Sequence, residues 1–328
     1  MSLADAAVEF VQPDTLAAVL LDGLAKAALF VMIASGLSLI FGLMGVLNFA
    51  HGSLTMIGAY LGGLVMVTVA AGSSGFGRLA MFAAAALFVF VVLSAFGSAV
   101  EATLIRPLYD RPLYQILLTF GVALVLEELV RIALLYRGMQ PRSEWQAAIG
   151  SKPAMLERTY AVAGIGTTGL ELFEILMGVL VVATIWTFLT RTRYGLIIRA
   201  GSEDSEMVSA LGIDVRRAFT VVFGLGVGLA GLAGALLMWD PRWGASVPLA
   251  MAVLLPSFVV VIVGGLGSFR GTVVAGIIVG LVDAAMTWWF TNAIRFAGLP
   301  ELTVFLILVG TLILRPQGLF GVEEVGGH

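Results

Sequence analysis

Residues 36–60 read GLSLIFGLMGVLNFAHGSLTMIGAY, a hydrophobic helical pattern that stops at a small polar cluster and then resumes. The cluster consists of Asn48, His51, Ser53 and Thr55, set among Gly42, Gly45 and Gly52. Unpaired backbone groups are costly in hydrocarbon, so a break at membrane depth persists only where it is buried in protein or lines a wet cavity. A broken helix therefore indicates a transport path. The alternative is an ordinary cytoplasmic turn between two membrane helices.

The composition of the whole chain is that of a membrane protein. Of the 328 residues, 60% are hydrophobic and 12% are charged, and the mean hydropathy is +1.04. These values predict an all-α fold, a polytopic transmembrane helical bundle. We expect a single transmembrane domain over residues 15–320, between an N-terminal segment, 1–14, and a short tail, 321–328. The chain has no cysteine, so it contains neither a disulfide nor a cysteine-based metal site.

Long apolar runs divide the chain into about eight or nine membrane segments, two of them broken or re-entrant around glycine-rich motifs. The runs cover residues 15–44, 53–70, 79–104, 113–135, 170–189, 218–238, 251–266, 271–290 and 302–314. The first run is long for one crossing, which predicts tilt or an interfacial start. The run that ends at Leu266 is short for a full crossing.

The distribution of basic residues predicts the orientation. The densest basic loop, residues 191–217, contains five arginines and is placed in the cytoplasm by the positive-inside rule. Counting crossings from this loop puts 321–328 in the cytoplasm and 136–169 outside, although 136–169 carries basic residues of its own. Residues 1–14 have no Lys or Arg, which agrees with an extracytoplasmic location.

A second stretch resembles the first. Residues 263–281 read VGGLGSFRGTVVAGIIVGL, and Arg270-Gly271-Thr272 aligns with His51-Gly52-Ser53. Both stretches continue into a helix with small residues four apart, Gly58 and Gly62 in one and Gly276 and Gly280 in the other, which predicts close helix packing. The match indicates a parallel repeat, or else the chance similarity of glycine-rich helices. The candidate translocation path is Asn48, His51, Gly52, Ser53, Gly267, Arg270, Gly271 and Thr272.

The basic loop contains the clearest helix signal outside the apolar runs. Ser202 is a suitable N-cap, Glu203 and Asp204 suit a helix start, and Gly212 suits the position after a helix end. Met207, Val208 and Leu211 supply an apolar face. The pattern predicts an amphipathic helix of about ten residues, which either rests on lipid headgroups or docks on a soluble partner.

Catalytic and metal chemistries fit the sequence poorly. The phosphate-binding motif GxxxxGK[ST] is absent, and neither lysine, Lys26 or Lys152, lies in such a setting, so any ATP hydrolysis must come from another chain. The glycine pattern at 226–231 matches a dinucleotide fingerprint but lies inside an apolar run, which favours helix packing. The sequence Gly-Ser-Ser-Gly at 72–75 looks like the serine motif of an intramembrane protease, but no histidine is placed to act as its base, so a turn is indicated. With two histidines and no cysteine we expect no metal site, and nothing indicates a nucleic-acid partner.

Several charged residues fall inside or beside the apolar runs. Glu127 and Arg131 are four residues apart, which predicts an ion pair, with a gate as the alternative. Asp283 is expected to face protein or water rather than lipid, and its partner is not identifiable from the sequence. Lys26 is expected to extend its side chain towards the outer interface.

Five motifs in order carry a resemblance to a known family. They are the 36–60 stretch, TFGVALVLEELVRI at 119–132, RAGSEDSEMVSALGID at 199–214, IVGGLGSFRGTVVAGIIVG at 262–280 and ILRPQGLFG at 313–321. Over about residues 16–320 the chain resembles the permeases of branched-chain amino-acid ABC importers, and more narrowly the LivH-type subunit.

The resemblance implies a bacterial inner-membrane transporter of several chains. These are a related LivM-type permease, two cytoplasmic ATPase subunits that bind ATP and Mg²⁺, and a periplasmic substrate-binding protein. It also implies that the 191–217 loop contacts an ATPase through a set of matching residues. They are Arg199, Ala200, Glu203, Met207, Leu211, Gly212 and Ile213.

The sequence is compatible with more than one substrate and more than one class of transporter. Members of the family carry branched-chain amino acids, other amino acids, urea, short amides or aromatic acids, and the 136–169 segment matches no family pattern. A stand-alone secondary transporter or channel is the competing class, and it has no need of a docking helix in the 191–217 loop. Membrane-embedded catalysis is disfavoured because no acid–base pair is apparent.

Overall fold

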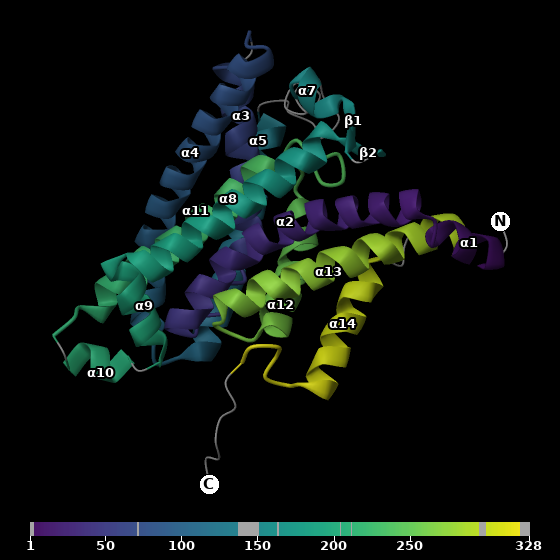
Figure 1. Ribbon diagram of the computed structural model, residues 1–328. Helices are drawn as coiled ribbons and strands as arrows, with labels where there is room; N and C mark the ends of the chain where they lie inside the picture. Colours follow the sequence, from purple (N-terminus) through teal and green to yellow (C-terminus); the bar gives the residue numbers. More distant parts are fainter. Residues whose placement is uncertain are drawn as a thin grey trace. The chain divides into compact units, whose positions relative to one another are not determined.

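The computed structural model describes residues 3–70, 72–136, 151–162, 164–203, 205–210, 212–294 and 300–321, with the side chains of 202, 203, 205, 206, 300 and 301 left aside. Within these ranges the regular secondary structure is helical apart from one small hairpin (Figure 1). The strands of the hairpin are β1 (Thr159–Val162) and β2 (Ile165–Thr168), which pair antiparallel with Thr159 opposite Thr168. The expected all-α, polytopic membrane fold is thereby confirmed.

The α-helices are α1 (Leu3–Phe10), α2 (Pro13–Met44), α3 (His51–Thr68), α4 (Gly75–Val100), α5 (Pro112–Tyr136), α7 (Ala154–Glu157), α8 (Gly169–Arg191), α9 (Arg193–Glu203), α10 (Ser205–Ala210), α11 (Val215–Leu237), α12 (Leu249–Gly264), α13 (Phe269–Trp289) and α14 (Pro300–Leu314). Two π-helical turns, η1 (Glu101–Ile105) and η3 (Phe290–Ile294), extend α4 and α13, and a 3₁₀ turn, η2 (Arg106–Leu108), follows η1.

Six helical stretches among the described residues are long and apolar enough to cross a membrane. They are Pro13–Met44, His51–Thr68, Gly75–Leu108, Gly169–Arg191, Val215–Leu237 and Phe269–Ile294, and the shorter apolar helices are Leu249–Gly264 and Leu302–Leu314. Helix α5, with 25 residues, supplies the remaining predicted segment. Each apolar run found in the sequence therefore lies largely in one helical stretch.

Contacts divide the chain into two compact units. Unit 1 comprises Met1–Ala34, Ala154–Val182 and Pro256–His328, and unit 2 comprises Ser35–Pro153 and Ala183–Leu255. The expectation of one membrane domain over 15–320 stays a prediction, and each unit is described by itself.

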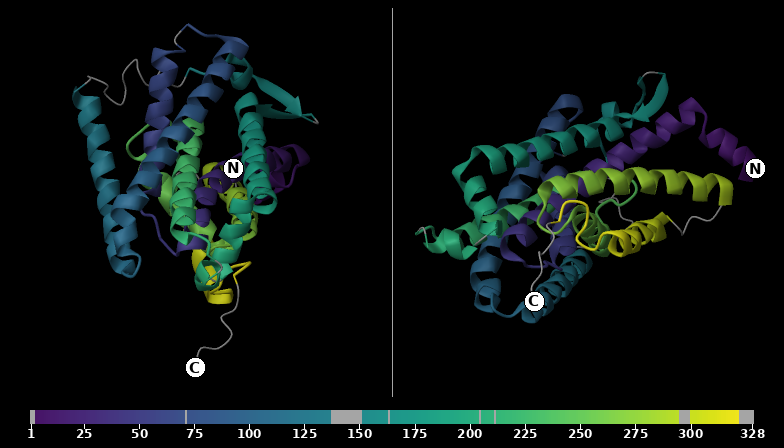
Figure 2. Two further views of the ribbon diagram at one scale, coloured as in Figure 1. Left: turned by 90° about the vertical axis from the view of Figure 1, so that its left-hand side faces the viewer. Right: turned by 60° about the horizontal axis from the view of Figure 1, so that its bottom comes forward.

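Unit 2 is built on α11, which packs against both α3 and α4 (Figures 1 and 2). Close approach depends on glycine, because a Cβ at Gly58 would overlap the backbone of Gly231, and a Cβ at Gly228 would overlap Ser94. Gly62 likewise faces Ala235. The predicted packing role of Gly58 and Gly62 is confirmed, and the glycine pattern at 226–231 is a helix-packing surface.

In unit 1 the first part of α2 packs on α13 through the other predicted glycine pair. A Cβ at Gly276 would overlap Val31, and a Cβ at Gly280 would overlap Ala27. The short helix α1 adds an aromatic contact, with the rings of Phe10 and Trp288 5.1 Å apart. Small residues thus bring these two long helices into backbone contact.

Candidate functional site

The first interruption separates α2 from α3. Helix α2 ends at Met44, Gly45 adopts a left-handed backbone with φ +65°, and α3 begins only at His51. Inside the break, the Asn48 side-chain oxygen accepts a hydrogen bond from Ala50 N at 3.1 Å, and the Asn48 carbonyl accepts one from His51 N at 3.1 Å. Asn48 therefore organises the turn that leads into α3, and the expected interruption is present.

Thr119 of α5 holds the same break from outside. Its hydroxyl oxygen accepts a hydrogen bond from Phe49 N at 3.2 Å, and its one hydrogen is shared between the Leu47 carbonyl at 3.3 Å and the Ile116 carbonyl of α5 at 3.1 Å. Backbone groups that leave a helix at membrane depth need such partners. The sequence analysis missed this residue, because a threonine in an apolar run carries no signal that distinguishes it from a packing residue.

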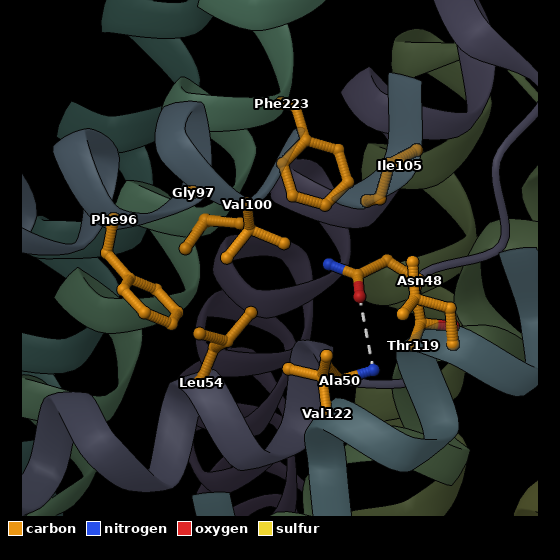
Figure 3. Close-up of a pocket in the computed structure, with 12 residues that line it drawn as sticks. Asn48, Ala50, Leu54, Phe96, Gly97, Val100, Ile105, Thr119, Val122 and Phe223 are labelled. Atoms are coloured by element: carbon orange, nitrogen blue, oxygen red, sulfur yellow. Dashed lines mark hydrogen bonds between the residues drawn. The ribbon is translucent and has the colours of Figure 1, made fainter. Parts of the chain in front are cut away.

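A small cavity of about 10 Å³ adjoins the break and has room for about one water molecule (Figure 3). Its wall is mostly apolar, with Leu54 of α3, Phe96 and Val100 of α4, and Phe223 of α11. The Asn48 amide nitrogen is buried, points into this cavity and has no hydrogen-bond partner among the described residues (Figure 3).

The first turn of α3 is fully enclosed within unit 2. His51 is buried beside Gly36, and a Cβ at Gly52 would overlap the Ala250 carbonyl oxygen. Ser53 is also buried, and its hydroxyl donates to Glu127 Oε1 at 3.0 Å.

That contact changes the expected role of Glu127. The predicted Glu127–Arg131 ion pair is wrong, because no such pair occurs among the ion pairs of the described residues. Glu127 turns instead towards α3, where the Ser53 hydroxyl binds it, and Arg131 remains exposed.

The second interruption, in unit 1, has related geometry. Helix α12 ends at Gly264, Gly265 and Gly267 have left-handed φ values of +100° and +84°, and α13 begins at Phe269. The Ser268 hydroxyl caps α13 by accepting from Gly271 N at 3.1 Å. A Cβ at Gly271 would overlap the Gly264 carbonyl oxygen, so the two helix ends touch through their backbones.

The flanking predicted residues of this break differ in exposure. Thr272 is buried, and its hydroxyl donates to the Ser268 carbonyl at 3.0 Å. Arg270 is exposed.

The C-terminal motif ILRPQGLFG closes this second break. Leu319 N donates to the Val263 carbonyl at 2.8 Å, and Phe320 N donates to the Gly264 carbonyl at 3.0 Å. These carbonyls belong to the last turn of α12 and have no partner within their helix. Gly318, with φ +78°, lets the chain pass against Gly265. The motif thus supplies the backbone partners that end α12, a role that its sequence alone did not reveal.

A buried ion cluster joins α2 and α13 within unit 1. Lys26 Nζ lies 2.9 Å from Asp283 Oδ2 and 3.3 Å from Asp22 Oδ2, and it donates to the Thr287 hydroxyl at 3.3 Å. The expectation that Lys26 extends to the outer interface is wrong, because its side chain is only 7% exposed. The missing partner of Asp283 is Lys26, so both charges are paired inside the protein as intramembrane charges require.

A second buried network lies where α4 turns towards α5. Glu101, which is fully buried, binds Arg106 Nη2 at 3.1 Å and accepts a hydrogen bond from the Tyr109 hydroxyl. Arg106 Nη2 also donates to the Thr220 hydroxyl of α11 at 2.7 Å. Burial, reinforced by Glu101, raises the pKa of Tyr109, which therefore stays protonated as a donor. The network ties the α4–α5 turn to the first turns of α11.

The loop predicted to dock on an ATPase forms two helices rather than one. The predicted N-cap at Ser202 is wrong, because Ser202 lies inside α9, which begins at Arg193, and a second helix, α10, covers Ser205–Ala210. The helix end is correct: Gly212 has φ +78°, its N donates to the Ser209 carbonyl, and Ile213 N donates to the Val208 carbonyl. Asp204 and Leu211 lie outside the described residues, as does the side chain of Glu203.

The residues predicted to contact an ATPase differ in their exposure on α9 and α10. Met207 is 60% exposed, whereas Val208, which was expected on the same apolar face, is buried. Arg199 is exposed and Ala200 is partly exposed. A Cβ at Gly201 would meet Leu43, so α9 touches α2 one residue before α2 ends at the first break.

The structure thus gathers the predicted path residues into two groups. Asn48, His51, Gly52 and Ser53 form the first interruption in unit 2, and Gly267, Arg270, Gly271 and Thr272 form the second in unit 1. Their part in translocation stays a prediction, as does the contact of the 191–217 loop with an ATPase.

Comparison with known proteins gives matches over nearly the whole chain. Residues 19–314 match the family model described as the permease component of branched-chain amino acid transport systems. The chain is 26% identical to the high-affinity branched-chain amino acid transport system permease protein BraD of Pseudomonas aeruginosa, over 93% of this chain and 96% of that protein. It is 24% identical to the permease protein LivH of Escherichia coli, over 93% and 95%. A probable LivH of Methanocaldococcus jannaschii is 25% identical, over 90% and 89%. No solved structure gives a significant match.

Proposed function

The chain belongs to the family of permease components of branched-chain amino acid transport systems, and we propose that it carries a branched-chain or related amino acid inward as one permease subunit of an ABC importer. The family match covers nearly the whole chain, and the relatives named above are permeases of branched-chain amino acid systems. The importer is placed in a bacterial inner membrane, where this multi-pass chain would meet a LivM-type second permease and a periplasmic substrate-binding protein.

Energy for transport comes, in this proposal, from two cytoplasmic ATPase subunits that hold ATP and Mg²⁺. The chain has no GxxxxGK[ST] motif to cradle the phosphates of a nucleotide. Helices α9 and α10 provide a surface for such a partner, with the exposed side chain of Met207 as an apolar anchor. Because α9 also touches Leu43 at the end of α2, a displacement of this loop reaches the first break directly.

The observation that carries the proposal is the pair of interrupted helices. In each, glycine brings two backbones into contact and a left-handed glycine ends the helix that precedes. A side chain also orders each break: the Asn48 amide binds Ala50 N in the first, and the Ser268 hydroxyl caps α13 in the second. Interruptions of this kind in membrane carriers expose backbone groups that bind solute or change partners during transport.

The proposal is tested by uptake of radiolabelled leucine in cells that lack other leucine transporters and express the complete set of subunits. We expect uptake that disappears when this chain is omitted and when the phosphate-binding lysine of the ATPases is replaced. A panel of unlabelled competitors, including urea, short amides and aromatic acids, identifies the solute class. Uptake that persists with inactive ATPases would assign the chain to the secondary transporters instead.

A further inference from the structure

Glu127 is an acidic residue on a membrane helix, and it lies against the first break. Its Oε1 accepts a hydrogen bond from the Ser53 hydroxyl at 3.0 Å, and Ser53, in the first turn of α3, is only 1% exposed. Glu127 is partly exposed, whereas its neighbour Glu128 is exposed. The contact with Ser53 therefore fixes one carboxylate oxygen of Glu127 at the start of α3 and leaves part of the side chain accessible.

Two contacts of α5 define the depth of the first break in the membrane. The apolar run of α5 covers residues 113–135, so its middle is Leu124. Thr119 and Glu127, which both bond to residues at the break, lie on either side of this middle, about 7.5 and 4.5 Å away along the helix axis. The hydrocarbon core extends about 15 Å to each side of its midplane. With the apolar run centred in the membrane, the break and Glu127 therefore lie near mid-depth, where discontinuous helices of membrane carriers bind their solutes.

A carboxylate at this depth needs a positive partner. Ionisable side chains in membrane segments pair with an opposite charge or with polar groups, and they commonly mark the path of a solute or an ion. Among the described residues, no Lys, Arg or His forms an ion pair with Glu127, and the Ser53 hydroxyl supplies a hydrogen bond but no charge. A proton would neutralise the carboxylate, but an importer driven by ATP needs no proton carrier. The remaining source of positive charge is the solute.

We propose that Glu127 binds the ammonium group of the solute as it passes the first break. This inference rests on the proposed function and deepens it, because it defines the class of solute: a small molecule with a protonated amine, as every α-amino acid has. Urea, short amides and simple aromatic acids have no ammonium group, and an aromatic carboxylate would be repelled by Glu127. The hydrogen bond from Ser53 positions the carboxylate and leaves Oε2 to accept a charge-assisted hydrogen bond from the ammonium group.

Solute analogues that lack one charge test the assignment in the assembled membrane complex, reconstituted in lipid nanodiscs without the substrate-binding protein. Displacement of radiolabelled leucine is measured with leucinamide, which keeps the ammonium group but has no carboxylate, and with isocaproate, which is leucine without its ammonium group. We expect leucinamide to displace leucine and isocaproate to have no effect. Equal displacement by the two analogues, or failure of the native complex to bind leucine, would overturn the inference.

Substitutions at two adjacent residues separate a binding role from a structural role. Glu127→Gln keeps the shape of the side chain and an oxygen that accepts from Ser53 but removes the charge, so we expect leucine binding to weaken about tenfold or more at an unchanged Tm. Glu127→Asp, which keeps the charge, should bind leucine more tightly than Glu127→Gln. The matched control Glu128→Gln should bind leucine as the native chain does, because Glu128 is exposed and forms no hydrogen bond with the break. Native leucine binding by Glu127→Gln would refute the proposal.

Leucine uptake by the same variants distinguishes this inference from the proposed function. We expect ATP-dependent uptake to fall in Glu127→Gln and to persist in Glu128→Gln. Uptake by Glu127→Gln at the native rate refutes the ammonium site and leaves the transport function standing. Absence of ATP-dependent uptake by the native transporter refutes the transport function itself.

A solute site must also be reached from water. The chain has no native cysteine, so Glu127→Cys and Val125→Cys each introduce a unique thiol. Val125 is 59% exposed and, two residues away, lies on the opposite side of α5, which makes it the matched control. We expect a membrane-impermeant charged thiosulfonate to modify position 127 in the assembled transporter and to leave position 125 unmodified, as mass spectrometry of the chain will show. An unreactive thiol at position 127 would place Glu127 away from any water-filled passage and overturn the proposal.

Discussion

Replacing Lys26 by methionine should destabilise the protein strongly, because the substitution keeps the length of the side chain but removes its charge. Lys26 Nζ lies 2.9 Å from Asp283 Oδ2, and the two side chains are only 7% and 14% exposed. Removing one partner of a buried ion pair costs roughly 3–5 kcal/mol, because the remaining charge stays desolvated without compensation. Asp22, the other partner, is 36% exposed, and such a pair contributes at most about 1 kcal/mol. Most of the expected loss of stability therefore comes from leaving the buried Asp283 carboxylate without a partner.

The assay is thermal unfolding of the purified chain in detergent, followed by tryptophan fluorescence. In long chains a loss of 1 kcal/mol in unfolding free energy lowers Tm by about 2 °C, so Lys26→Met should lower Tm by roughly 6–10 °C. Asp22→Asn, the matched control, should lower it by about 2 °C or less. The double variant Lys26→Met/Asp283→Asn should regain most of the loss, since no buried charge remains. A double variant as unstable as Lys26→Met would refute the reasoning, and so would a single variant as stable as the native chain.

Three further changes probe the interruptions and the loop. Gly52→Leu and Gly271→Leu should abolish leucine uptake, because each adds a side chain where a carbonyl oxygen already lies. The control Gly72→Leu should transport normally, because a Cβ at Gly72 meets nothing within 4 Å. Uptake by all three variants at the native rate would contradict this account. Thr119→Val should lower stability by about 1–3 kcal/mol by leaving Phe49 N and the Leu47 carbonyl unpaired, and Thr119→Ser should not, as denaturant unfolding will show. Met207→Asp should lose co-purification with the ATPases at normal membrane insertion while Met207→Leu keeps it, and the docking role fails if the aspartate variant still binds them.

Local patterns in the sequence were sufficient to predict the long apolar helices and the two interruptions between them. A long apolar run indicates a helix in the membrane, and a polar cluster such as the one from Asn48 to Ser53 indicates that the helix has ended. Close packing at Gly58 and Gly280 was predictable for the same reason, because glycine has no side chain and so marks a position where another helix can approach. The left-handed Gly212 beyond the end of α10 was likewise predictable from its residue type.

Partners that come from distant parts of the chain were not predictable. The sequence predicted that Asp283 faces protein or water and that Lys26 extends to the outer interface, and only the packing of α13 on α2 shows that the two form a pair. For Glu127 the sequence offered a partner one turn away, and the fold supplied Ser53 of α3 instead.

The tertiary structure also revealed what the sequence motifs do. The 313–321 motif was recognisable as a family feature, yet its role in ending α12 depends on hydrogen bonds from Leu319 and Phe320 to carbonyls of another helix. Thr119 carried no signal at all until α5 lay beside the first break. The physical reason is common to these cases: periodicity and residue size act within a helical turn, so the sequence by itself determined where helices form and stop. Hydrogen bonds and ion pairs depend on the distance between two atoms, and only the folded chain decides which atoms meet.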